Sequence, residues 1–362
     1  MVYNTTGRPF LGYFCSYVPV EIITAAGFVP YRLTGDKKAT TLAYSYVPPN
    51  CCSFQRSVLE RALRGDFDFL TGIVIPQTCD VMREIFDVWE EYTSYAFYHR
   101  LAVPLRVNTP AAVDFFEEEL VKLTTALSKI SPRKITGETL REAIVTHNRQ
   151  RQLLQKIAKT RSFSTGLSGR EFMELLFRTF RTPPEKSISQ LETVLNSVPA
   201  EQAEEAEKLR FMVLGSVIDN PEIISLLENG SGMIVADDLC YGRRFYRLQV
   251  DTREEPLKAL ATTYLRKINC PCKFPGERRW EAILEEAQRV SVDGMVFLLQ
   301  KFCDTHRFEQ PDLERKLTAS GYPVLVLEIE NQTAPETLST RVQAFTEMLA
   351  TRRSITGRKE RG

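Results

Sequence analysis

The second half of this chain repeats the pattern of its first half, and the repeat places cysteines at matching positions. Each copy contains a cysteine pair before a predicted helix, then an apolar run typical of a buried strand, and finally Cys-Asp. The three parts are Cys51-Cys52, Phe69–Ile75 and Cys79-Asp80 in one copy, and Cys270-Pro271-Cys272, Val292–Leu299 and Cys303-Asp304 in the other. A chain with this repeat is constrained to form two similar units with related cysteine sites.

Both copies alternate predicted strands with predicted helices. The expected strands are Pro9–Cys15, Val29–Leu33, Phe69–Ile75 and Leu101–Val107 in the first copy, and Arg210–Gly215, Met233–Ala236, Val292–Leu299 and Pro323–Glu328 in the second. Alternating units of this kind form parallel sheets with right-handed crossovers. We therefore predict an α/β fold with two parallel sheets that are related by internal duplication.

A wholly helical region separates the two copies. Its expected helices are Glu138–Lys159, Ser168–Phe180 and Ser187–Leu209, and N-terminal capping patterns precede the first two. The predicted organisation is an N-terminal α/β domain (1–113), a helical insert (114–209), a C-terminal α/β domain (210–352) and a disordered basic tail (353–362).

Length, charge and the N-terminus narrow the class of protein. A chain of 362 residues can form two domains with full cores, and its net charge of +1 gives no reason to expect nucleic acid or an anionic membrane. No apolar run approaches the ~20 residues of a membrane span, and the N-terminus has no signal-peptide features. We therefore expect a cytoplasmic protein. Because the cytosol keeps thiols reduced, we expect the eight cysteines of this chain to be metal ligands, reactive thiols or buried apolar residues.

All cysteines except Cys15 lie beside the ends of predicted strands or in the two matching loops. Strand ends precede Cys79, Cys240 and Cys303, and the loops contain Cys51, Cys52, Cys270 and Cys272. Functional groups collect outside the carboxyl ends of strands in an open parallel sheet. If the two sheets face each other, we expect these seven thiols to converge on one cleft. Cys15 falls inside a predicted strand among aromatic residues, and we expect it to be a packing residue.

The thiol pattern favours an iron–sulfur cluster. Structural zinc sites usually combine two Cys knuckles with wider spacing than the pairs found here. A catalytic cysteine needs a histidine partner, and of the three histidines only His306 lies close to a cysteine, Cys303, in the sequence. His306 is a candidate proton donor, although a surface histidine at a helix start would look the same. Thiolate ligation of iron and sulfide is the remaining interpretation, with zinc and reactive or merely buried thiols as alternatives.

The chain contains no Gly-rich loop with the spacing of a nucleotide-binding motif. It therefore offers no recognisable nucleotide site. If the chemistry of this protein requires ATP, we expect another protein to hydrolyse it.

Several further motifs are spread over nearly the whole chain. They are Gly12-Tyr13-Phe14-Cys15-Ser16-Tyr17-Val18-Pro19 with Glu21-Ile22, Pro76-Gln77-Thr78-Cys79-Asp80, Asp87-Val88-Trp89, Asp237-Asp238-Leu239-Cys240 and Lys301-Phe302-Cys303-Asp304. Together they resemble the benzoyl-CoA reductase / 2-hydroxyacyl-CoA dehydratase family. The resemblance implies two flavodoxin-like (Rossmann-like) domains, a [4Fe-4S] cluster held by three cysteines, and an ATP-dependent activase that supplies low-potential electrons. On this sequence the family trio corresponds to Cys52, Cys79 and Cys303.

The additional cysteines depart from that minimal pattern and resemble a branch of the family, the double-cubane-cluster proteins. This resemblance implies an [8Fe-9S] double cubane with six cysteine ligands, a homodimer, and a separate ATP-hydrolysing iron–sulfur reductase. Six ligands are then expected among seven candidates, which are Cys51, Cys52, Cys79, Cys240, Cys270, Cys272 and Cys303. The symmetry of the duplication favours the ligands Cys51, Cys52 and Cys79 from one copy and Cys270, Cys272 and Cys303 from the other. The position of Cys240 at a strand end favours Cys240 as a ligand in place of one of these six.

We therefore expect a low-potential iron–sulfur oxidoreductase that reduces a small molecule in the cleft between the domains. The alternative is a subunit with a single [4Fe-4S] cluster that acts on an acyl-CoA, as a 2-hydroxyacyl-CoA dehydratase (a lyase) or a benzoyl-CoA reductase. A non-catalytic zinc or electron-carrier protein is a third hypothesis. Around the cleft, we expect Asp80 and Asp304 to cap helices and Asp237-Asp238 to bind substrate or fill a turn. We expect Arg243-Arg244 to lie in a solvated loop, with contact to an anionic substrate or partner as the alternative.

Overall fold

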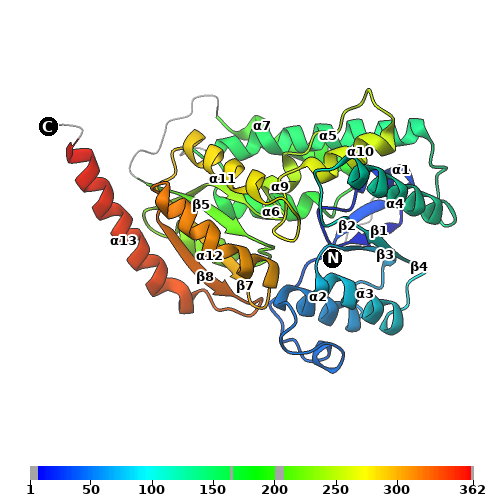
Figure 1. Ribbon diagram of the computed structural model, residues 1–362, viewed down its shortest axis with the longest axis horizontal. Coiled ribbons are helices and arrows are strands. Elements are labelled where there is room, and N and C mark those ends of the chain that lie inside the picture. The colour runs from blue at the N-terminus through cyan, green and yellow to red at the C-terminus, as the bar shows by residue number, and fades with distance from the viewer. Residues whose placement is uncertain (1–6, 164–165, 200–207, 360–362) are drawn as a thin grey trace.

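The chain forms two four-stranded parallel sheets and a layer of helices that joins them (Figure 1). The computed structural model describes residues 7–163, 166–199 and 208–359. The first sheet, in the order β2-β1-β3-β4, contains β1 (Phe10–Tyr13), β2 (Val29–Arg32), β3 (Leu70–Gln77) and β4 (Phe97–Ala102). The second, in the order β6-β5-β7-β8, contains β5 (Leu209–Gly215), β6 (Gly232–Asp238), β7 (Gly294–Gln300) and β8 (Val324–Ile329). Equivalent strands thus occupy equivalent positions, and the predicted α/β fold is confirmed.

One strand lies earlier in the chain than we predicted. β4 spans Phe97–Ala102, whereas the prediction was Leu101–Val107. β4 is at the edge of its sheet, which leaves Arg100 exposed and interrupts the apolar run that marks a central strand. The predicted segment instead contains Pro104, which cannot donate to a ladder of hydrogen bonds.

Helices cover both sheets. The helices around the first sheet are α1 (Val20–Ala25), α2 (Ser53–Leu63), α3 (Asp80–Tyr92) and α4 (Pro110–Ser128), with the short 3-10 helix η1 (Ala43–Ser45) beside α2. Those around the second sheet are α8 (Pro221–Glu228), α11 (Glu277–Arg289), α12 (Asp304–Ala319) and α13 (Glu336–Lys359). Side chains of α11 and α12 form one core with β5–β7, and those of α8 and α13 form a second core. Both faces of this sheet are therefore covered, which explains the continuous apolar character of its strands.

The helical layer contains α5 (Gly137–Thr160), α6 (Gly169–Thr179), α7 (Pro184–Ser197), α9 (Arg243–Tyr246) and α10 (Pro256–Arg266). α5 packs against α1 of the first half and against α9 and α10 of the second, so it connects the two halves. The third predicted helix begins earlier than expected, at Pro184, and ends earlier, at Ser197. The remainder of that prediction falls on residues 200–207, outside the described residues, and on β5.

The last helix is longer than we predicted. α13 continues to Lys359, through most of the segment that we expected to be a disordered tail. Within residues 7–163, 166–199 and 208–359, no helix has the length and apolar character needed to cross a membrane.

A buried ion pair holds the helical layer against the first half. Arg151 of α5 donates to Glu21 of α1 at 2.7 Å and to the hydroxyl of Tyr264 of α10 at 3.0 Å. The Tyr264 hydroxyl in turn donates to the second oxygen of Glu21 at 2.8 Å. The side chains of Arg151 and Glu21 are both 0% exposed. Each charge is therefore paired and hydrogen-bonded, as a buried ion requires.

Replacing Arg151 with methionine is expected to lower the free energy of unfolding by about 3–5 kcal/mol, because Glu21 would remain buried without a cation. The control is Arg149→Met on the same helix, since Arg149 pairs with Glu192 at the surface, where the two side chains are 46% and 42% exposed. That variant is expected to lose less than about 1 kcal/mol. Urea unfolding measures both, and equal losses would contradict a special role for the buried pair.

Candidate metal centre

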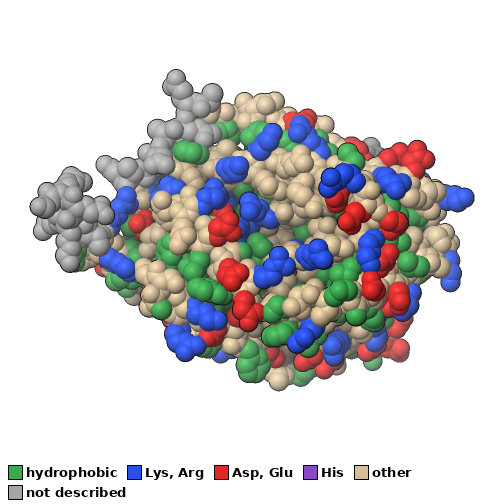
Figure 2. Space-filling model, turned by 45° about the horizontal axis from the view of Figure 1, so that its top comes forward, with side chains coloured by type: hydrophobic (Ala, Val, Ile, Leu, Met, Phe, Trp, Pro, Cys, Tyr) green, Lys and Arg blue, Asp and Glu red, His purple; other side chains and the backbone are tan. Residues whose placement is uncertain are grey.

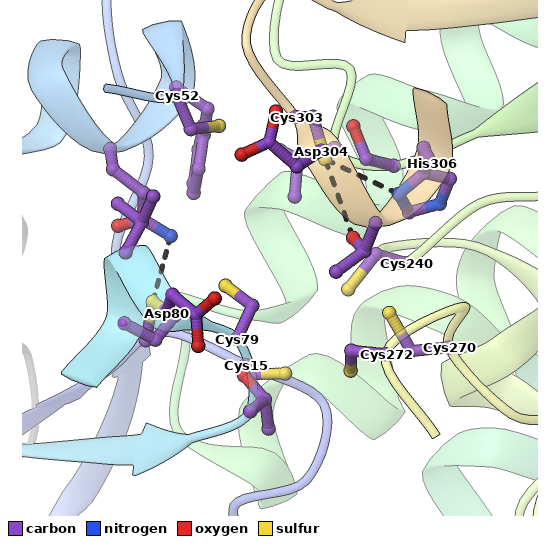
Figure 3. Close-up of a pocket in the computed structure, with 18 of the residues that line it drawn as sticks. Cys15, Cys52, Cys79, Asp80, Cys240, Cys270, Cys272, Cys303, Asp304 and His306 are labelled. Atoms are coloured by element: carbon purple, nitrogen blue, oxygen red, sulfur yellow. Dashed lines mark hydrogen bonds between the residues drawn. The ribbon is translucent and has the colours of Figure 1, made fainter. Parts of the chain in front are cut away.

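A pocket of about 130 Å³ lies at the carboxyl ends of the two sheets. Cysteines from both halves of the chain line it, and they are Cys15, Cys52, Cys79, Cys240, Cys270, Cys272 and Cys303. In Figure 3, Cys52 and Cys79 lie on one side of the pocket, and Cys240, Cys270, Cys272 and Cys303 lie on the other. The fold thus brings thiols that are distant in the sequence to one place.

Strand ends and helix starts position these thiols. Cys79 and Cys303 are the N-cap residues of α3 and α12, just past β3 and β7. Cys52 is the N-cap residue of α2, and Cys240 follows β6. Because a helix N-terminus carries partial positive charge, it favours the thiolate form of a cysteine beside it. At Cys79 a hydrogen bond from the backbone of Met82 acts in this direction, but burial outweighs it and raises the pKa of the thiol to about 12. The cap positions therefore favour the thiolate form without producing it by themselves.

Two cysteines lie differently from the sequence-based expectation. Cys51 is 7% exposed, belongs to the hydrophobic core and is not among the residues that line the pocket. Cys15, which we expected to be a packing residue, does line the pocket. The strand predicted over Pro9–Cys15 ends at Tyr13. Cys15 therefore follows the carboxyl end of β1, and the strand-end rule that located the other thiols would also have located this one.

The Cys52 and Cys303 thiols meet across the two halves of the chain. Hydrogen bonding between them raises the pKa of Cys52 and holds the pKa of Cys303 well below its ordinary value. His306 also lowers the pKa of Cys303, since its Nδ1 lies 3.4 Å from the Cys303 sulfur. The ring of His306 is buried, and its Nε2 has no hydrogen-bond partner within the described part of the chain. With Nδ1 protonated, His306 would donate a hydrogen bond to the Cys303 thiolate.

Cys15 and Cys240 form a second pair across the halves. A hydrogen bond from Cys15 and the charge of Arg32 hold the pKa of Cys240 well below its ordinary value. The Arg32 Nη2 lies 3.1 Å from the Cys240 sulfur, and the Arg32 side chain is 0% exposed. Arg32 has no carboxylate within ion-pair distance among the described residues. The Cys240 thiolate is therefore placed to balance the charge of this buried guanidinium.

Two buried lysines lie near the same thiols. The Nζ of Lys267 donates to the carbonyl and hydroxyl oxygens of Ser16 at 2.5 and 2.7 Å, and the Nζ of Lys273 donates to the carbonyl of Val103 at 3.0 Å. Neither lysine forms an ion pair with a carboxylate of residues 7–163, 166–199 or 208–359. Burial lowers the pKa of Lys267 to about 8 and also lowers that of Lys273, while nearby cysteines oppose the shift. Negative charge at the thiols would keep both lysines protonated.

Asp80 and Asp304, which we expected to cap helices, are not the cap residues. Asp80 and Asp304 are exposed first residues of α3 and α12, and the caps themselves are the cysteines before them. Both aspartates line the pocket. Our prediction that they act as caps is therefore wrong.

The Asp237-Asp238 pair is buried in ion pairs at the end of β6. Asp237 pairs with Arg161 at 2.9 Å, and Asp238 pairs with Arg279 at 2.8 Å and with Arg244 at 3.6 Å. Arg244 is buried like its neighbour Arg243, so the expectation of a solvated loop here is wrong. These pairs hold the end of β6 and the turn that carries Cys240.

The thiols are not arranged around a single metal ion. In the described part of the chain, no group of three or more His, Cys, Asp or Glu side chains has the geometry of such a site. Seven cysteines nevertheless face one pocket. This donor set suits a soft, thiolate-seeking group that is larger than one ion.

Comparison with known proteins gives a consistent result. The family model described as 2-hydroxyglutaryl-CoA dehydratase, D-component, matches residues 15–349. The (R)-phenyllactyl-CoA dehydratase beta subunit of Clostridium sporogenes is 25% identical over 95% of this chain and 92% of its own length. A benzoyl-CoA reductase subunit of Thauera aromatica is 27% identical over 88% and 84%, and (R)-2-hydroxyglutaryl-CoA dehydratase subunit beta of Acidaminococcus fermentans is 24% identical over 96% and 94%. All three relatives are named as enzyme subunits.

Mild oxidation of the metal-free chain is expected to form the disulfides Cys52–Cys303 and Cys15–Cys240, because the thiols of each pair line the same pocket and perturb each other's pKa. Peptide mass spectrometry without reduction detects these cross-links between the halves. If only Cys270 and Cys272 became linked, the described arrangement of the two halves around the pocket would be wrong.

Proposed function

The chain belongs to the 2-hydroxyglutaryl-CoA dehydratase D-component family, and from this premise we propose that it is a low-potential iron–sulfur enzyme that delivers single electrons to a small molecule. The relatives are dehydratase and benzoyl-CoA reductase subunits. The observation that carries the proposal is the set of seven cysteines, drawn from both halves, that lines one pocket. The proposed cellular location is the cytoplasm, where these thiols would remain reduced.

The number and kind of donors support a cluster larger than one cubane. Thiolates are the usual ligands of iron–sulfur clusters, and one [4Fe-4S] cluster takes up to four of them. The pocket offers more than this, so we propose an [8Fe-9S] double cubane held by six of its cysteines. Cys52, Cys79 and Cys303 would hold one cubane, and three of Cys15, Cys240, Cys270 and Cys272 would hold the other. Cys51 is left out of this set because it lies away from the pocket.

Charge in the pocket wall supports the same assignment. Arg32, Lys267 and Lys273 are buried without carboxylate partners among the described residues, and all three lie near the second group of thiols. A buried cation without an anion is costly. Thiolates that ligate an anionic cluster would supply the missing negative charge.

When bound, a cluster of this kind stores and releases electrons one at a time at low potential. The chain's own residues would hold the thiolates in place and keep water away. The apolar side chains of Phe14, Phe54, Val217 and Phe302 line the pocket for the second purpose. His306 would stabilise the Cys303 thiolate through its hydrogen bond.

The proposed partners follow from what the chain lacks. Its sequence has no nucleotide-binding motif, so we propose that a separate ATP-hydrolysing iron–sulfur reductase supplies the electrons. We propose a homodimer, because one chain already has enough cysteines for two cubanes.

A second function is favoured by the names of the relatives. In that case the chain would hold one [4Fe-4S] cluster through Cys52, Cys79 and Cys303, and act as a subunit of an acyl-CoA dehydratase or reductase. The Cys15, Cys240, Cys270 and Cys272 thiols would then remain free.

Anaerobic purification followed by iron and acid-labile sulfide analysis separates the two functions. We expect about eight irons per chain for the double cubane and about four for the single cubane. Zinc without iron would contradict both proposals and support a non-catalytic metal protein.

Serine variants sharpen this test. Under the double-cubane proposal, Cys240→Ser is expected to lower the iron content from about eight to about four per chain, because one cubane loses a ligand. Cys51→Ser is the matched control and is expected to leave the iron content unchanged, since Cys51 does not line the pocket. Unchanged iron contents in Cys15→Ser, Cys240→Ser, Cys270→Ser and Cys272→Ser alike would contradict the second cubane, because three of these four thiols are its proposed ligands. Circular dichroism of each variant checks that it is folded.

A further inference from the structure

Charged side chains are distributed unevenly around the thiol pocket. Its cysteines form a first group (Cys52, Cys79 and Cys303) and a second group (Cys15, Cys240, Cys270 and Cys272), as proposed for the two cubanes. Burial does not distinguish the groups, because Cys52 is 9% exposed, Cys272 is 8% exposed and the other five are partly exposed. A difference in the surrounding charge would therefore make the two groups unequal.

Three buried cations lie near the second group. The Nη2 of Arg32 lies 3.1 Å from the Cys240 sulfur. The Nζ of Lys267 donates to the hydroxyl of Ser16, and this hydroxyl lies 3.8 Å from the same sulfur. Burial lowers the pKa of Lys273, and the charge on thiols of the second group opposes this shift. Positive charge therefore acts on the second group from three side chains.

Carboxylates at this end of the pocket do not cancel these cations. Asp237 and Asp238 lie shortly before Cys240 in the chain, but they pair with Arg161 and Arg279 instead. The excess of positive charge is also local. The whole chain has a net charge of +1, and Lys and Arg side chains lie among Asp and Glu side chains over much of the surface in Figure 2.

Carboxylates lie beside the first group instead. Asp80 and Asp304 directly follow Cys79 and Cys303, and both aspartates are exposed and line the pocket (Figure 3). Neither aspartate forms an ion pair with a lysine or arginine of the described residues. Burial raises the pKa of the Cys79 thiol, and the charge of Asp80 adds to this shift. Negative charge therefore acts on the first group.

One hydrogen bond acts in the opposite direction at the first group. The Nδ1 of His306 lies 3.4 Å from the Cys303 sulfur. Hydrogen bonds to a ligating sulfur and nearby charge both set the potential of an iron–sulfur group. Arg32 offers the Cys240 sulfur a similar bond, which a charged donor makes roughly twice as strong as a neutral one does. His306 therefore does not reverse the difference between the two groups.

Nearby positive charge stabilises an added electron, and nearby negative charge destabilises it. We infer that the two groups of thiols hold iron at different reduction potentials, and that the second group has the higher potential. This inference rests on the proposed double cubane. The first electron from the proposed reductase would settle beside Arg32, Lys267 and Lys273, and the second would have to occupy the first group. Each step oxidises the reductase by one electron and forms no covalent bond.

The two electrons would then have different tasks. Of the residues that line the pocket, only Asp80 and Asp304 are exposed, so the pocket reaches the surface beside the first group. An electron held there is the stronger reductant, because its potential is lower. A small molecule that enters the pocket would meet this electron first, while the second group would act as a store.

Redox titration of the anaerobically purified protein, followed by EPR spectroscopy, tests the inference. We expect two reduction steps at different potentials. In Arg32→Met, the step at the higher potential is expected to become roughly tenfold less favourable, which is about 59 mV for one electron, because a positive charge is lost. The step at the lower potential should not move. Arg32→Lys restores a positive charge and is expected to recover part of the shift.

Exposed variants give a second test that does not depend on the folding of a variant of buried Arg32. Asp80→Asn/Asp304→Asn is expected to make the step at the lower potential roughly threefold more favourable, or about 30 mV by the same conversion, because water screens exposed charges. The step at the higher potential should not move. The control is Asp87→Asn on α3, since the Asp87 side chain is 67% exposed and lies outside the pocket. It is expected to move neither step.

Equal shifts of both steps in Arg32→Met, or the same response in Asp80→Asn/Asp304→Asn as in Asp87→Asn, would overturn the inference. Iron analysis of each sample separates such a result from a failure of the proposed function. About four irons per chain would contradict the double cubane itself. About eight irons with a single reduction step would overturn only the difference between the two groups.

Discussion

Many thiols can share one buried pocket only if the charge that they carry as ligands is balanced by the surrounding protein. Arg32, Lys267 and Lys273 are placed to provide that balance here, since each is buried and none has a carboxylate partner among the described residues. The contact between Arg32 and the Cys240 sulfur joins a strand of the first sheet to the end of a strand in the second. Charge compensation and the association of the two halves therefore depend on the same side chains.

The internal duplication explains the position of the pocket but not its full set of thiols. Cys79 and Cys303 occupy equivalent places after β3 and β7, as the repeat requires. Cys15 and Val217 are also equivalent, because they follow the equivalent strand residues Tyr13 of β1 and Gly215 of β5, yet only the first is a cysteine. Cys240 follows β6 and lies against Cys15 instead. The two halves have thus diverged so that each supplies thiols that the other lacks.

Sequence patterns predicted the sheets and most of the thiol pocket, because both depend on local features. Apolar runs identify central strands, and a residue just past such a run falls at the sheet edge. These sequence patterns failed where the environment of a residue depends on contacts with distant parts of the chain. β4 is a partly exposed edge strand, and Cys51 turns into the core although its neighbour Cys52 lines the pocket. The ion pairs of Asp237 and Asp238 join residues far apart in the chain, and no local pattern marks them.

We propose that one pocket, formed by both halves, holds a group larger than a single cubane. Anomalous X-ray diffraction at the iron edge, from crystals grown without oxygen, tests it most directly. We expect two groups of iron in the pocket, one beside Cys52, Cys79 and Cys303 and one beside Cys240 and Cys270. Iron beside the first group alone, or no iron in the pocket, would contradict it.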